Sequence, residues 1–68
     1  MDDTDRAAEF RTRARAIRDQ VRRLKARANA MPPGQMRDML ATQADILADG
    51  ARKLEARALE LTPPVGTA

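Results

Sequence analysis

Arginines are the residues best equipped for chemistry in this chain, and they gather in its first half. Between positions 11 and 27 the sequence has eight basic residues and a single acid, Asp19. A guanidinium group donates paired hydrogen bonds to a phosphate or a carboxylate, so a stripe of such groups can follow a nucleic-acid backbone. The candidate phosphate contacts are Arg15, Arg18, Arg22, Arg23 and Lys25.

The groups that usually perform catalysis are missing. The sequence has no histidine, cysteine, tyrosine or serine, so no nucleophile has a base beside it. A carboxylate pair such as Asp45 and Asp49 is better explained as a solvated helix face than as a catalytic pair, and the glycines are too isolated to form a phosphate-binding loop. Metal binding is not expected, because histidine and cysteine are both absent. We therefore expect no enzyme activity, no catalytic residue, no metal, no cofactor and no small-molecule substrate.

Two runs of apolar residues, spaced alternately by three and four, predict the helices that carry these side chains. The first run is Ala7, Phe10, Ala14, Ile17, Val21, Leu24, Ala28 and Met31, and the second is Leu40, Ala44, Leu47, Ala51, Leu54, Ala58 and Leu61. Small residues at one heptad position and large ones at the other are typical of closely packed antiparallel helices. The predicted fold is all-α: an antiparallel two-helix hairpin with an Ala/Leu heptad coiled coil.

Prolines and acidic residues set the expected boundaries of this hairpin. Residues 1–4 form an acidic N-terminal cap region, with Thr4 as the expected N-cap. Residues 5–61 form the hairpin: a helix over 5–30, a Pro-Pro-Gly turn over 31–34 and a helix over 34–61. The first helix should end at Ala30, because a residue that precedes a proline avoids the helical region. Residues 62–68 are expected to be a flexible tail.

The two flanks of the hairpin differ in character. A tight corner near Pro33 places residues opposite each other when their numbers sum to about 66. On one flank this register pairs Arg22 with Asp45 and Arg11 with Glu55, so the basic stripe is partly neutralised. The other flank is largely apolar, and we predict that it is a protein interface formed by Ala16, Gln20, Met36, Met39, Gln43, Ile46 and Gly50.

Gly50 supports this interpretation, because a glycine inside a helix costs about 1 kcal/mol relative to alanine. Close approach of another backbone would explain it. The alternative is that the apolar residues of this flank only widen the seam near the turn.

The length of the chain also points to association. A chain of 68 residues without cysteine has a marginal core and no disulfide to support it. We expect the hairpin to dimerise into a four-helix bundle or to bind a larger protein.

The sequence lacks a membrane span and begins with acidic residues, so we expect a cytoplasmic protein that binds no membrane. The predicted function is a small protein-protein interaction module, such as a regulator, adaptor or accessory subunit; the alternative is nucleic-acid binding, to RNA or DNA, by the arginine-rich helix.

Overall fold

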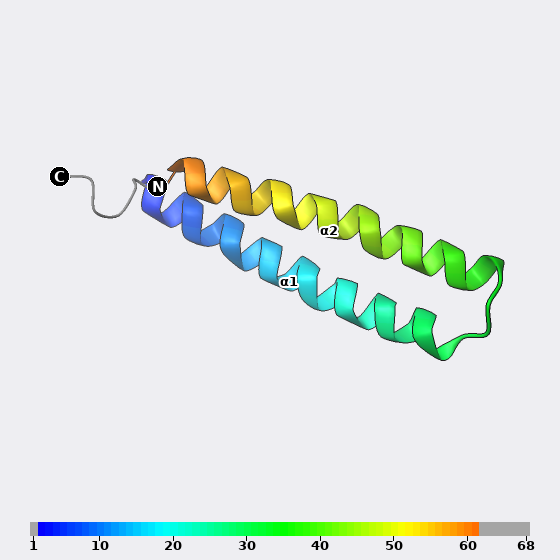
Figure 1. Cartoon of the computed structure of the whole chain (residues 1–68). Helices are drawn as coiled ribbons and strands as arrows, with labels where there is room; N and C mark the ends of the chain where they lie inside the picture. Colours follow the sequence, from blue (N-terminus) through cyan, green and yellow to red (C-terminus); the bar gives the residue numbers. More distant parts are fainter. Residues whose placement is uncertain (1, 62–68) are drawn as a thin grey trace.

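Two long antiparallel helices joined by a short turn make up the computed structural model, which describes residues 2–61. Helix α1 spans Asp3–Ala30 and helix α2 spans Gln35–Leu61. They pack side by side along their lengths, so the start of α1 lies beside the end of α2 (Figure 1). No strand occurs in the described residues. The prediction of an all-α fold with two packed helices is confirmed, and the tail predicted over 62–68 lies outside the described residues.

Helix α1 begins earlier than predicted because a different residue caps it. The N-cap is Asp2, not Thr4: its Oδ1 accepts a hydrogen bond from the backbone N–H of Asp5 at 2.9 Å. Two acids, Asp3 and Asp5, lie in the first turn, where the helix dipole favours negative charge. The cap and the charges together stabilise the first turn, so that Thr4 lies within it.

The turn follows from the two prolines. Met31 adopts an extended conformation with φ −94° and ψ 149°, as expected for a residue before a proline, and its N–H donates to the Ala28 carbonyl at 3.1 Å. The Gly34 carbonyl accepts from the N–H of Asp38 at 3.1 Å, which starts the hydrogen-bond pattern of α2. The chain therefore reverses within the few residues between Ala30 and Gln35.

The core of the hairpin is a line of small residues, which we call the alanine line. Its members, all buried, are Ala7, Ala14, Val21, Ala28, Ala44, Ala51 and Ala58. The large residues of the two runs remain only half-buried: Phe10, Ile17, Leu24, Met31, Leu40, Leu47, Leu54 and Leu61. The helices thus meet through alanine methyl groups, and most of the large apolar side chains lie beside the contact instead of inside it.

Candidate protein interface

The order of residues along each helix gives the hairpin two different faces. In each helix a large residue follows a residue of the alanine line by three positions, as Ile17 follows Ala14 and Leu54 follows Ala51. Each residue rotates about 100° around the helix axis. A residue three positions along therefore points roughly 60° to one side of the starting residue, and a residue four positions along points roughly 40° to the other side. In antiparallel helices, residues with the same offset come to the same side. The half-buried large residues of both helices therefore share one side, which we call the apolar face.

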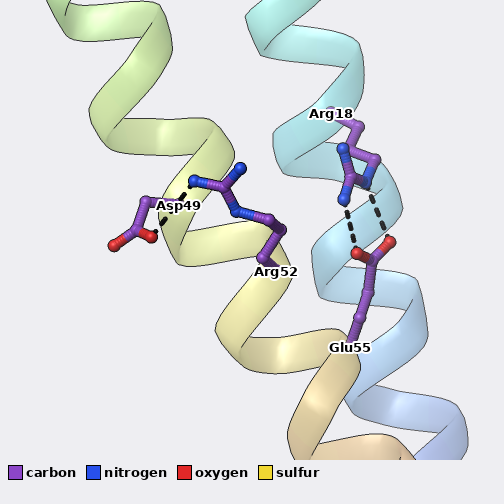
Figure 2. Close-up of polar contacts among 4 residues, drawn as sticks. All are labelled: Arg18, Asp49, Arg52 and Glu55. Carbon is purple, nitrogen blue, oxygen red and sulfur yellow. Dashed lines mark hydrogen bonds and ion pairs between the residues drawn. The ribbon is translucent and has the colours of Figure 1, made fainter.

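Residues four positions after the alanine line occupy the opposite side, which we call the charged face. Arg18 and Glu55 have this offset, and their side chains form a bidentate ion pair between the two helices (Figure 2). Arg18 Nε donates to Oε2 at 2.8 Å and Nη2 donates to Oε1 at 2.5 Å. The hydrogen bonds from Arg18 lower the pKa of Glu55, and those to Glu55 raise the pKa of Arg18. The pair ties α1 to α2 at the surface.

The cross-helix pairing differs from the register expected from the sequence. Glu55 pairs with Arg18, so the paired residue numbers sum to 73 and not to about 66. Arg22 pairs with Asp19 in its own helix and not with Asp45. Helical side chains lean toward the N-terminus of their own helix. In antiparallel helices this lean brings together long side chains whose residue numbers have a larger sum than the sum expected from the position of the turn.

Three further surface ion pairs lie within one helix. Arg13 pairs with Glu9 at 3.0 Å, and Asp49 accepts from both Arg52 at 3.3 Å and Lys53 at 3.2 Å. The hydrogen bonds from Lys53 and Arg52 lower the pKa of Asp49. Such pairs one turn apart support the individual helices and do not fix how the helices pack.

Four of the five candidate phosphate contacts come together on the charged face. Arg15 and Arg18 line a shallow hollow beside Glu55, and Arg22 and Lys25 line the adjoining hollow. All four are exposed, but Arg18 and Arg22 are already bonded to carboxylates. Arg23 is also exposed, and it lies about 100° around the helix from Arg22, away from this group.

The outer edge of the apolar face carries the most exposed apolar side chains of the predicted interface. Met36, Met39 and Ile46 are 61%, 59% and 66% exposed. Such exposure contradicts the alternative in which these residues only widen the contact between the two helices near the turn. A shallow groove runs along this edge of α2, lined by Gln35, Met36, Asp38, Met39, Leu40, Thr42, Gln43 and Ile46. We call the set Met36, Met39, Gln43, Ile46 and Gly50 the methionine patch. Ala16 and Gln20, the predicted α1 members of the interface, are also exposed.

Gly50 lies on this edge without a close neighbour from the hairpin itself. A Cβ atom added at Gly50 would meet nothing within 4 Å, so close approach of α1 does not require glycine there. The residue instead leaves a notch in the surface of α2, one that no side chain of the described hairpin fills.

Two features of these faces are not predicted from the sequence: the exposure of Leu59 and the partial burial of the large residues. Leu59, 72% exposed, lines the arginine hollow on the charged face, although it belongs to neither apolar run. The large residues of the two runs, expected inside the seam, are only partly buried. The constant offset of three positions in both helices was the available signal that they would share one side.

Neither a metal site, a membrane span nor a known relative assigns a function to the hairpin. Among residues 2–61, no group of three or more potential metal ligands is placed to hold an ion, and neither described helix is long and apolar enough to cross a membrane. No known protein family, curated protein or solved structure matches this chain.

Proposed function

We propose that this chain is a small non-enzymatic protein-protein interaction module, a regulator, adaptor or accessory subunit that acts through its apolar face. One observation carries the proposal: Met36, Met39 and Ile46 are exposed on the same side of the hairpin on which the large residues of the two runs are only partly buried. Contiguous apolar surface of this kind on a small domain usually marks an interface.

The energetics of the core support the same conclusion. Burying a methylene-sized group contributes about 0.8 kcal/mol, whereas fully burying a leucine or methionine side chain contributes about 1.5–3 kcal/mol. Among residues 2–61, six of the seven buried residues are alanines, and the large residues of the two runs are only partly buried, so part of the stronger contribution is left for a partner. A partner seated on the apolar face would complete the burial of the large residues. The chain has no cysteine with which to stabilise itself in another way.

The architecture of the assembly follows from the same pattern. The small and large residues repeat every seven positions in both helices, which favours coiled-coil packing. Two hairpins that bring their apolar faces together would form a four-helix bundle with the large residues inside it. The partner is then either a second copy of the chain or a larger protein that offers helices of its own.

Replacing Met39 with aspartate tests this function. Met39 lies in the methionine patch, and a buried carboxylate there would be unpaired, so the variant should lose self-association and capture of a partner from the native host. The matched control is Leu59→Asp, which makes the same change at a more exposed position on the charged face of the same helix. Light scattering measures the mass, and circular dichroism checks that both variants stay helical. Unchanged association in Met39→Asp would contradict the proposal.

A second candidate function is nucleic-acid binding by the charged face. The observation in its favour is that Arg15, Arg18, Arg22 and Lys25 border adjoining hollows on one side of α1. The carboxylates bonded to Arg18 and Arg22 reduce the charge available to phosphates, which is why this function ranks second. Titration with RNA and duplex DNA at low and moderate salt tests it. A steep salt dependence that is lost in Arg15→Ala/Arg22→Ala would support it, and its absence would exclude this face.

A further inference from the structure

The methionine patch has a nearly symmetric arrangement along α2. Its members lie at positions 36, 39, 43, 46 and 50, so Gln43 is seven residues from each end. A two-fold axis through Gln43, perpendicular to the helix, would bring together residues whose numbers sum to 86. Met36 would then face the partner's Gly50, Met39 would lie beside the partner's Ile46, and Gln43 would face the partner's Gln43.

The paired residues are complementary in size. Met36 is 61% exposed, and its unbranched side chain adapts to irregular spaces. Gly50 offers the open notch in which an added Cβ would meet nothing within 4 Å. The helix therefore carries a projecting side chain and a notch at symmetry-related positions, and a second copy would fill both notches with its own methionines.

The residue on the axis is suited to meeting its own copy. A glutamine amide has both donor N–H groups and an acceptor oxygen, so two copies of Gln43 can hydrogen-bond to each other. Gln43 is exposed and lines the groove between the two methionines and Ile46. A single polar pair in an apolar helix contact specifies the register, since any shifted alignment leaves both amides unpaired.

Charge decides between the two possible directions of pairing. The methionine patch itself contains no charged residue. C-terminal to Gly50, the same edge of α2 carries Lys53, Arg57 and Glu60. A parallel pair of α2 helices would place Lys53 and Arg57 next to their own copies, with like charges in contact. In the antiparallel pair about Gln43, Lys53 would correspond to position 33, which precedes the partner's α2. The charged segment would then extend past the contact.

We propose that the methionine patch binds a second copy of this chain, with the two α2 helices antiparallel about a two-fold axis at Gln43. The inference rests on the proposed function, because the methionine patch is the outer edge of the apolar face, and it names the partner and the register. The contact is made by the two α2 helices and differs from a four-helix bundle that buries the whole apolar face. The hairpins overlap at their turn ends, so the charged open ends point away from each other.

Single cysteines test the register directly, because the natural chain has none. A disulfide forms only when the two Cβ atoms come within about 4.5 Å. Under mild oxidation, Gln43→Cys should give a linked dimer. Met36→Cys alone should not, since the two copies of position 36 would lie about 21 Å apart along the axis, at about 1.5 Å per residue. An equal mixture of Met36→Cys and Gly50→Cys should give the linked heterodimer, and Leu59→Cys is the control that should remain unlinked.

The outcomes separate the inference from the proposed function. Self-linking of Met36→Cys as efficient as that of Gln43→Cys would show parallel pairing and overturn the inference. A wild-type dimer that Met39→Asp dissociates, but that forms neither predicted link, would overturn the register and leave the proposed function standing. A wild-type chain that stays monomeric at high concentration by light scattering overturns the second copy as partner. The proposed function would then depend on whether Met39→Asp abolishes capture of a host protein.

Discussion

Replacing Ala51 with leucine tests whether the helices really meet along a line of small residues. Ala51 is completely buried, and Ala44 and Ala58, seven residues to either side, are buried to the same degree. Leucine adds three carbon atoms at a point where the facing helix leaves no space. The helices must either separate, which also weakens the neighbouring alanine contacts, or hold the side chain in a strained rotamer. Overpacking of this kind costs about 1–3 kcal/mol.

The expected effect is large for so small a protein. In a domain of this size a loss of 1 kcal/mol lowers the Tm by roughly 4–8 °C, so a cost of about 2 kcal/mol lowers it by roughly 8–16 °C. Thermal unfolding followed by circular dichroism, at one fixed protein concentration, measures the change. The matched control is Ala56→Leu, at an exposed position of the same helix. Alanine and leucine have similar helix propensities, so the control should change the Tm little. Equal Tm values for the two variants, or a higher value for Ala51→Leu, would refute the alanine line.

Three further substitutions test the other elements. Gly50→Ala should raise the free energy of unfolding by about 1 kcal/mol in urea titrations of the dilute chain, since the added Cβ meets nothing and only helix propensity changes; a decrease would reveal a close contact at the notch. Asp2→Ala should cost about 0.5–2 kcal/mol and speed amide exchange at Asp5, because that N–H loses its acceptor, and unchanged exchange would argue against the cap. Glu55 has its pKa lowered by hydrogen bonds from Arg18, so its contribution is present above the unfolded pKa of about 4.3 and lost as the pH falls through the lower folded value. Glu55→Gln should therefore lose less stability than wild type between neutral and acidic pH, and identical pH profiles would contradict the pairing.

The parts of the fold that could be predicted are those that depend on local patterns. The three-four spacing identified both helices and their contact line, and the proline after Met31 marked the end of α1 at Ala30. The N-cap was missed because several residues near the start can cap a helix, and only the geometry shows that Asp2 does so.

The candidate site was harder to predict because it depends on three-dimensional arrangement. The register did not predict the ion pair of Glu55 with Arg18, because a count along the chain ignores the lean of long side chains. The exposed side chains of Met39 and Ile46 follow from their helical spacing outside the seam. The open notch at Gly50 could not be predicted, because the sequence does not show whether a glycine packs against another backbone or faces open space.

The alanine line also bears on how long the chain would last in a cell. Because its core is mostly methyl groups, a solitary hairpin gains little from folding, and a partner that binds only the folded form raises its stability in proportion to the logarithm of the partner's concentration. Proteases act on the opened chain, so degradation follows the population of that form. Abundance of the partner would then set the half-life of this protein, and copies made in excess of it would be the first to be removed.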